Sequence, residues 1–277
     1  MKKSLVNVSI LVICILFALV ALAPFFFYLE LSFKPGVELV RKGINFNIDI
    51  GMMSLKNYEL LITGKDGIYL YWYRNSILIT LFYTLIALFL TSFVGYGLAA
   101  YKFKGKNLIF IVVLIVMMIP VEILILPLFK LTVTLKIINT YAGVILPFAV
   151  SPFAVFFFRQ YAMSVPKDFI DAGRIDGSTE FGIYFKVIVP LMLPAYGAMT
   201  ILLAMNSWNN FVWPLIVLRD NNMLTLPIGL GTMITPYGNN YDMLIAGAVM
   251  SVVPIIIVFI FNQKAFISGL TIGGVKG

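Results

Sequence analysis

The sequence predicts an all-α, polytopic membrane protein with six transmembrane helices, and three observations support this. Hydrophobic residues make up 61% of the 277 positions and charged residues only 12%, whereas an ordinary soluble domain is roughly 25% charged. A helix that spans a bilayer needs about 20 mostly apolar residues, and uncharged stretches of that order recur along the chain. Lysine and arginine lie mainly between these stretches. A water-soluble globule is therefore excluded.

Five uncharged runs are long enough to span a bilayer, and a sixth is shorter. They are Ser4–Leu29, Asn75–Tyr101, Ile137–Phe158, Val187–Leu218 and Met243–Gln263, with Asn107–Val121 as the shorter run. The shorter run extends to Leu128 if Glu122 is tolerated in the membrane. The run from Val187 is long enough to hide an extra span, but its prolines restrict it to one. We therefore expect six helices.

The first run has two interpretations. Lys2 and Lys3, the apolar stretch and a small-residue segment at Ala21–Ala23 resemble a signal peptide with its cleavage site. The uncharged run is longer than the apolar region of an ordinary signal peptide, however, and Pro24 is followed by further aromatic residues. We therefore predict a retained first helix.

Basic residues predict that both chain termini lie in the cytoplasm, because cytoplasmic loops carry an excess of lysine and arginine. The inner segments then hold Lys2, Lys3, Lys102, Lys104, Lys106, Arg159, Lys167, Arg174, Lys186, Lys264 and Lys276, and the two short outer loops hold Lys130, Lys136 and Arg219. The first outer segment also carries basic residues, but they alternate with acids. The net charge of +8 follows from this topology, and basic residues so dispersed form no nucleic-acid-binding face.

These assignments divide the chain into four regions. We predict an N-terminal end with the first helix at 1–30, an extracytoplasmic loop at 31–71, a transmembrane domain with helices two to six at 72–264, and a cytoplasmic tail at 265–277. The outer segment contains several glycines and short apolar pieces, so we expect it to fold as a small cap. An aromatic cluster that starts at Tyr69 is interpreted mainly as an anchor at the headgroup level.

The residue inventory excludes several kinds of chemistry. Histidine is absent and Cys14 stands alone, so zinc sites, disulfides and Cys–His nucleophiles are excluded. The chain contains no G-x-x-x-x-G-K-[ST] motif and therefore does not cradle ATP phosphates itself. We expect neither a metal, nor a cofactor, nor a catalytic site.

Small and acidic residues in the expected spans have both a packing and a functional interpretation. Gly95 and Ala99 share a helix face and permit close approach of another helix, either within this chain or from a second subunit. Glu122 is an intramembrane carboxylate and thus a functional candidate. It lies either at the outer interface or in a pathway, where it would couple transport to an ion.

The densest polar patch within an expected span is Asn206-Ser207-Trp208-Asn209-Asn210. If the fifth helix begins near Pro194 at the inner face, Asn206 lies about 18 Å along it, just past the middle of the bilayer. Buried amides need partners, so these residues either hydrogen-bond neighbouring helices or line a wet pathway. Asparagine beside tryptophan also suits a sugar, whose hydroxyls bind amides and whose C–H faces stack on aromatic rings.

The loop at 159–186 is the main polar segment between the apolar runs, and it carries equal numbers of acidic and basic residues. Ser164 can cap a helix that has Pro166 in its first turn and that continues over Lys167–Asp176. Gly177 suits the left-handed residue that ends such a helix, and Ser178 can cap the next one. We therefore expect two short helices joined by a glycine turn.

This loop resembles that of importer permeases of the ATP-binding-cassette (ABC) class, whose pattern is Glu-Ala-Ala, three residues, Gly, nine residues and Ile-x-Leu-Pro. The corresponding residues are Asp171-Ala172-Gly173, Asp176-Gly177 and Val187-Ile188-Val189-Pro190. Asp replaces Glu, Gly replaces the second Ala, and Val occupies both aliphatic positions. Ala172, Gly173 and Gly177 would leave a low surface around which a partner's groove can close.

Further segments resemble the carbohydrate-uptake branch of this class, in particular its maltose-permease G type. They are Trp208–Leu215, Leu224–Pro227 and the ending Gly269–Gly277, and the similarity extends from about Trp72 to the C-terminus. The resemblance implies a type I ABC importer permease-like bundle in a bacterial or archaeal plasma membrane.

The resemblance also implies a set of partners. A second permease would complete the pathway, two cytoplasmic ATPase subunits would use ATP and dock on Asp171–Gly177, and an extracytoplasmic solute-binding protein would deliver sugar. Closure of the ATPase pair would tilt the permease helices. Two alternatives are a stand-alone, ion-coupled secondary transporter that uses Glu122 and a membrane scaffold that moves no solute.

Overall fold

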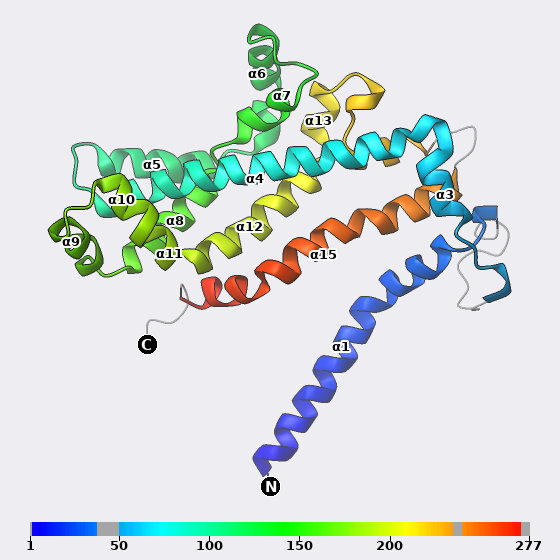
Figure 1. Cartoon of the computed structure of the whole chain (residues 1–277), viewed down its shortest axis with the longest axis horizontal. Helices are drawn as coiled ribbons and strands as arrows, with labels where there is room; N and C mark the ends of the chain where they lie inside the picture. The colour runs from blue at the N-terminus through cyan, green and yellow to red at the C-terminus, as the bar shows by residue number, and fades with distance from the viewer. Residues whose placement is uncertain (1, 38–49, 235–239, 273–277) are drawn as a thin grey trace. The chain divides into compact units, whose positions relative to one another are not determined.

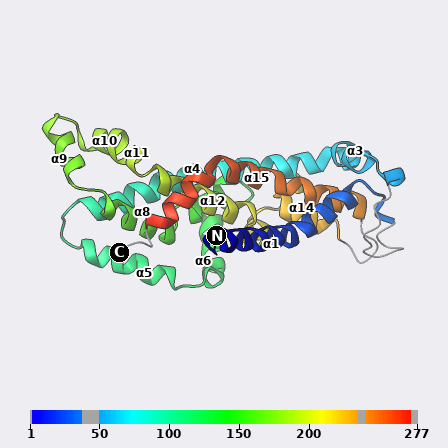
Figure 2. The same ribbon diagram turned by 90° about the horizontal axis from the view of Figure 1, so that it is seen from below.

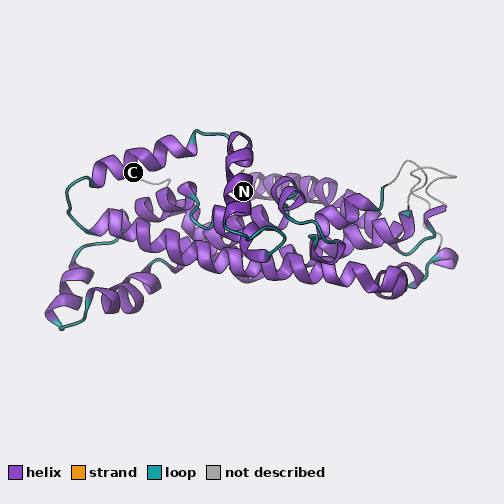
Figure 3. Ribbon diagram, turned by 90° about the horizontal axis from the view of Figure 1, so that it is seen from above, coloured by secondary structure: helices purple, strands orange, loops and turns teal. Residues whose placement is uncertain are grey.

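A computed structural model describes residues 2–37, 50–234 and 240–272. All regular elements in these ranges are helices (Figures 1 and 3), which confirms the predicted all-α class. Part of the predicted outer cap, residues 38–49, and the ending Gly273–Gly277 lie outside the described residues.

Among the described residues, three single helices are long and apolar enough to cross a membrane: α1 (Lys2–Ser32), α4 (Ile68–Ala100) and α15 (Tyr241–Ile272). Three pairs of shorter helices would raise the number of spans to six if each bent pair is one span. The six-span topology with both ends in the cytoplasm stays a prediction. Helix α15 continues past residue 264, where we place the start of the tail.

The three pairs differ in how sharply they bend. Helices α5 (Lys106–Met117) and α6 (Val121–Thr134) meet at 104°, α7 (Tyr141–Ile145) and α8 (Pro152–Ser164) belong to a pair bent by 49°, and the segment Glu180–Leu191 meets α12 (Leu193–Trp208) at 78°. A proline lies at or beside each break. Pro120 has an extended backbone before α6, because proline cannot donate the hydrogen bond that would continue a helix. The run 107–128 is therefore two helices.

The chain forms two compact units. The first contains residues 1–71 and 229–253 and the second contains residues 72–228 and 254–277. In the first unit, α3 (Lys56–Thr63) is joined to the end of α1 by the Asn57 side chain, which donates to the carbonyls of Ser32 at 2.9 Å and Lys34 at 2.8 Å. The described part of the predicted cap is thus ordered by buried polar contacts.

The core of the second unit forms where α4 packs against α8. A Cβ atom on Gly95 would lie 2.7 Å from Phe158 Cβ and 2.8 Å from the Arg159 nitrogen, so only glycine permits this separation of the two helices. Phe158 is fully buried in the contact. The interpretation of Gly95 as a packing position within this chain is confirmed.

A buried amide organises the other end of the second unit. The Asn75 side chain is fully buried, and it donates to the carbonyls of Asn222 at 2.8 Å and Leu224 at 3.0 Å. The Tyr141 hydroxyl donates to its oxygen. Trp72 is buried nearby and donates to the Asn221 carbonyl. Trp72, a member of the aromatic cluster that starts at Tyr69, therefore packs within the protein, whereas the cluster as a whole was interpreted mainly as a headgroup anchor.

Candidate coupling site

Two short helices project from one end of the second unit, α9 (Asp168–Ile175) and α10 (Glu180–Ile183) (Figures 1 and 2). They coincide with the two helices predicted in the loop 159–186. On α9, Ile170 and Gly173 are buried, whereas Asp171, Ala172 and the residues that follow Gly173 are exposed. The helix therefore has one face that packs inward and one that is free for a partner.

A glycine turn ends α9 as predicted. Gly177 has a φ of +73°, the left-handed conformation that glycine adopts without strain. Its N–H donates to the Arg174 carbonyl and the Ser178 N–H donates to the Gly173 carbonyl, both at 3.0 Å. These two bonds make a Schellman motif, which satisfies carbonyls at the helix end. No atom outside the turn lies within 4 Å of a Cβ built on Gly177.

Both predicted caps of these helices are wrong. Ser164 is the last residue of α8, and its hydroxyl donates to the Tyr161 carbonyl, while α9 begins after Lys167 without a side-chain cap. Thr179, not Ser178, caps α10 and accepts from the Gly182 N–H at 3.1 Å. Ser178 is used instead in the Schellman motif, which moves the cap one residue along the chain.

Gly173 also has a different role from the one expected. A Cβ atom at this position would lie 3.0 Å from Ile183 Cγ1, and Ile183 is fully buried. The small residue therefore lets α9 pack closely on α10. It does not lower the surface that a partner would meet, and only Ala172 and Gly177 keep that role.

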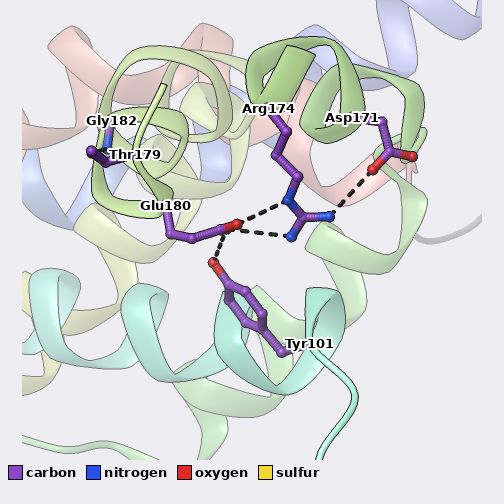
Figure 4. Close-up of polar contacts among 6 residues, drawn as sticks. All are labelled: Tyr101, Asp171, Arg174, Thr179, Glu180 and Gly182. Carbon is purple, nitrogen blue, oxygen red and sulfur yellow. Dashed lines mark hydrogen bonds and ion pairs between the residues drawn. The ribbon is translucent and has the colours of Figure 1, made fainter. Parts of the chain in front are cut away.

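A polar cluster, which we call the clamp, joins the two loop helices to the end of α4 (Figure 4). Arg174 Nε donates to Glu180 Oε1 at 2.9 Å, and its terminal nitrogen lies 3.3 Å from Asp171 Oδ1. The Tyr101 hydroxyl, directly after α4, donates to Glu180 Oε2 at 2.6 Å. The clamp thus consists of Tyr101, Asp171, Arg174 and Glu180, and it crosses the glycine turn.

The charges of the clamp stabilise one another. The hydrogen bonds from Arg174 and then Tyr101 lower the pKa of the Glu180 carboxyl, and the bond to Glu180 raises the pKa of the Arg174 guanidinium. Burial and the bond to Glu180 raise the pKa of the Tyr101 phenol. At neutral pH Glu180 is therefore an ionised carboxylate that is held by the Arg174 guanidinium and by the neutral Tyr101 hydroxyl.

A second polar cluster includes Tyr184, the residue that directly follows α10. The hydroxyls of Ser92 on α4, Tyr184 after α10 and Tyr196 on α12 form a closed hydroxyl triangle, with separations of 2.7 Å between Ser92 and each tyrosine and 3.0 Å between the tyrosines. Ser92 and Tyr184 are almost completely buried. The triangle connects the loop to two long helices of the unit.

Tyr184 begins an unusual segment of the chain. Residues Tyr184–Ile188 form a π-helical turn, followed by the short α11 (Val189–Leu191), which contains Pro190. Proline cannot donate a backbone hydrogen bond, and π turns inside α-helices frequently lie at functional sites. Pro190 itself is exposed. The end of the predicted loop motif therefore marks a helix irregularity, followed by the bend into α12.

The asparagine patch lies where α12 ends. Asn206 and Asn209 are exposed, Asn210 is half-buried, and the chain breaks before α13 (Val212–Val217). Within the described residues, none of these three amide side chains hydrogen-bonds a neighbouring helix, so they do not join helices within this part of the chain. Trp208 is buried against Tyr73, with ring centroids 6.0 Å apart. A pathway role for Asn206, Trp208, Asn209 and Asn210 stays a prediction.

Glu122 lies in the first turn of α6, directly after the break that follows Pro120, and it is exposed. A carboxylate is favourable there because the N-terminus of a helix carries a partial positive charge. Its position is explained by local helix electrostatics, and it belongs to neither polar cluster.

The clamp residues Tyr101, Arg174 and Glu180 and the hydroxyl triangle were not predicted as sites. Arg174 and Glu180 lie on either side of Gly177 with opposite charges, so a glycine turn that reverses the chain was a signal for their pairing. Tyr101 and Ser92 gave no such signal, because their partners are distant in the sequence.

Residues 88–266 match the family described as "Binding-protein-dependent transport system inner membrane component". The chain is 56% identical over 274 residues to the arabinooligosaccharides transport system permease protein AraQ of Bacillus subtilis (strain 168), covering 99% of this chain and 97% of that protein. It is 32% identical over 268 residues to the galactooligosaccharides transport system permease protein GanQ of the same organism, covering 94% and 92%. The chain therefore belongs to this family of multi-pass inner-membrane transport components.

A solved structure has the same fold. A chain from the crystal structure of a bacterial ABC transporter involved in the import of the acidic polysaccharide alginate aligns with a TM-score of 0.81, covering 95% of this chain and 97% of that chain at 23% sequence identity. The predicted ABC importer permease fold is thereby confirmed.

Proposed function

We propose that this chain is a permease subunit of an ABC importer and forms half of the membrane pathway for a carbohydrate. A second permease subunit forms the other half, and two cytoplasmic ATPase subunits hydrolyse ATP. An extracytoplasmic solute-binding protein delivers the sugar. The chain itself is not an enzyme and binds no cofactor.

The observation that carries this proposal is the similarity, over almost the whole chain, to relatives named as oligosaccharide permeases. The relative with 56% identity is named for arabinooligosaccharides, which makes oligosaccharides of that kind the first substrates to test. The asparagine and tryptophan side chains of the patch at 206–210 offer amide and aromatic groups of the type that bind sugars.

The exposed face of α9 is the surface that we assign to the ATPase. It presents Asp171, Ala172, Asp176 and Gly177, next to Arg174. The clamp joins α9 to α10 and to the end of α4, so a force on α9 reaches these elements. The hydroxyl triangle then links the same motion to α12, because Tyr184 follows α10 directly. Closure of a partner on α9 would thus tilt helices that line the pathway.

The test is reconstitution of the importer in vesicles, with ATP on the cytoplasmic side and the binding protein with labelled arabinooligosaccharide on the other. We expect accumulation of sugar that requires ATP, the binding protein and both permeases. Labelled galactooligosaccharide in parallel reports on substrate class. Vesicles without the second permease should accumulate none.

The alternative is a stand-alone transporter driven by an ion gradient through Glu122. It predicts uptake by this chain alone, driven by protons or sodium and abolished by Glu122→Gln. We expect instead that Glu122→Gln leaves ATP-driven uptake unchanged, since this carboxylate lies in neither polar cluster. Gradient-driven uptake by the isolated chain would refute the proposed function.

A further inference from the structure

Basic side chains gather at the end of the second unit where α4 and α8 end and α5 begins. This basic cluster consists of Lys102, Lys104, Lys106, Arg159 and Lys167. The Lys106 ammonium donates to the carbonyls of Ala99 at 3.1 Å and Tyr101 at 2.9 Å. These bonds hold Lys106 against the end of α4 and fold the short connection that carries Lys102 and Lys104 back on itself.

Ring packing brings Arg159 to the same place. Phe110 on α5 stacks on Phe156 of α8, with centroids 6.2 Å apart, and the Arg159 guanidinium carbon lies 3.7 Å from the centre of the Phe110 ring. Lys106 is four residues before Phe110 and therefore lies on the same face of α5. Lys102, Arg159 and Lys167 are all close enough to Lys106 for their charges to repel it.

No acidic side chain balances the positive charge of the cluster within the described residues. Among the described residues, none of its five members forms an ion pair. Asp171 and Glu180 of the nearby loop are both taken by Arg174. Asp168 follows Lys167 in the chain but makes no ion pair with it in this part of the structure. Like charges held together without counter-ions repel, so the arrangement favours an anionic ligand.

Arg159 has an unused donor that points to the same conclusion. Its Nε atom is buried and has no hydrogen-bond partner in the described structure. A guanidinium binds phosphate with paired N–H donors and is well suited to it. The neighbourhood is also apolar, because Phe103, Met163 and Phe169 are 46%, 58% and 46% exposed. Basic residues combined with exposed phenylalanine are typical of segments that lie at a membrane interface.

We propose that the basic cluster binds the phosphate headgroup of an anionic phospholipid in the leaflet that the charge distribution predicts to be cytoplasmic. The acyl chains would lie along α5, where Leu108, Ile109, Ile111 and Val112 are exposed. Basic pockets between membrane helices on the cytoplasmic side bind such headgroups. Arg159 on α8 and Lys167 directly before α9 both precede the coupling site, so the bound lipid would steady its start.

The experiment uses the assembled complex in nanodiscs of phosphatidylcholine with a rising fraction of phosphatidylglycerol, and native mass spectrometry counts the phosphatidylglycerol that the complex retains. The main variant is Lys102→Gln/Lys104→Gln, since both side chains are exposed and their loss leaves the fold intact. Arg159→Gln is the second variant. Lys264→Gln is the control, because it removes one exposed charge on the same predicted side, outside the cluster.

We expect the phosphatidylglycerol fraction for half-maximal retention to rise about five-fold for each charge removed at low salt, and to be unchanged in Lys264→Gln. Salt should weaken retention by the unaltered complex. Equal retention by the double variant and the unaltered complex would overturn the proposal. So would displacement of the lipid by millimolar inorganic phosphate, which would identify a free-phosphate site. Loss of ATPase co-purification with lipid retention unchanged would instead identify a protein contact.

Discussion

The two ends of the second unit are held together in opposite ways. At one end, the fully buried Asn75 amide joins α4 to the segment at 221–224 and to Tyr141. At the other end, the clamp joins α4 to α9 and α10 through side chains that water reaches, since those of Arg174 and Glu180 are 45% and 47% exposed. One end is locked by desolvated hydrogen bonds and the other by a solvated ion pair.

This difference separates a rigid end from one that can move. A buried donor or acceptor that loses its partner costs about 1–3 kcal/mol, so the Asn75 contacts strongly resist rearrangement. An exposed ion pair contributes little to stability, because water replaces either partner at little cost. The coupling site can therefore change its contacts when a partner binds, while the opposite end stays fixed as the frame against which α4 tilts.

The largest loss of stability is expected from a substitution at the buried end, at Asn75. Asn75→Leu keeps the approximate volume but leaves the carbonyls of Asn222 and Leu224 without their donor, so we expect the free energy of unfolding to fall by about 3 kcal/mol. Thermal unfolding of the purified protein in detergent measures the loss. The control is Asn139→Gly, which removes the solvent-exposed hydrogen bonds of this side chain to the Asp220 carboxylate and to the N–H groups of Arg219 and Asp220, and keeps the positive φ. Equal losses in the two variants would contradict the distinction.

Local patterns predicted the parts of the coupling site that depend on neighbouring residues. Gly177 was identified correctly because its left-handed conformation follows from its position after a short helix. Gly95 was identified because small residues four apart on a helix predict close packing. The Tyr101–Glu180 bond of the clamp and the Asn75 contacts were missed because their partners lie far along the chain and no spacing rule connects them.

Hydropathy predicted the class of fold but not the course of each helix. The run from Asn107 is apolar throughout, yet the chain turns by 104° between α5 and α6. Apolar composition predicts that a segment is stable inside a membrane. It does not predict the direction in which the helix runs. Pro120 was a local signal for that break, but prolines such as Pro24 and Pro254 lie within continuous helices. Proline content alone therefore does not locate bends.

The glycine turn gives the next largest effect. Gly177→Val places a β-branched residue at a φ of +73°, which costs about 1–2 kcal/mol locally, and we expect the Schellman motif to open. The ATPase subunit retained on the affinity-purified permease should then fall several-fold. Gly177→Asn is the matched control, since asparagine tolerates this conformation and space is available for its Cβ. Retention by the valine variant equal to that of the unaltered protein would show that α9 is not the docking element.

The hydroxyl triangle lies between the two ends and should have an intermediate effect. Tyr184→Phe removes one hydroxyl from Ser92 and Tyr196, so we expect a loss of about 1 kcal/mol in the free energy of unfolding. We also expect less sugar imported per ATP hydrolysed. Tyr83→Phe is the control, because Tyr83 on α4 is a buried tyrosine like Tyr184 but lies outside the triangle. If the ratio of uptake to hydrolysis stays constant while stability falls, the triangle supports packing only.

The smallest effect on stability and the clearest effect on coupling should come from the clamp. Glu180→Gln removes the charge that holds Arg174 across the turn, and water compensates for the lost ion pair at this exposed position. We expect the free energy of unfolding to be unchanged and uptake per ATP to fall.

Because the clamp lowers the pKa of Glu180, the contribution of the ionised Glu180 to the clamp is complete above the ordinary glutamate pKa. It is lost only as the pH falls through the lowered value. Coupling in the unaltered importer should therefore be constant near neutral pH and decline in acid. The Glu180→Gln importer should lack that acid step, and an unchanged step in this variant would mean that another group produces it.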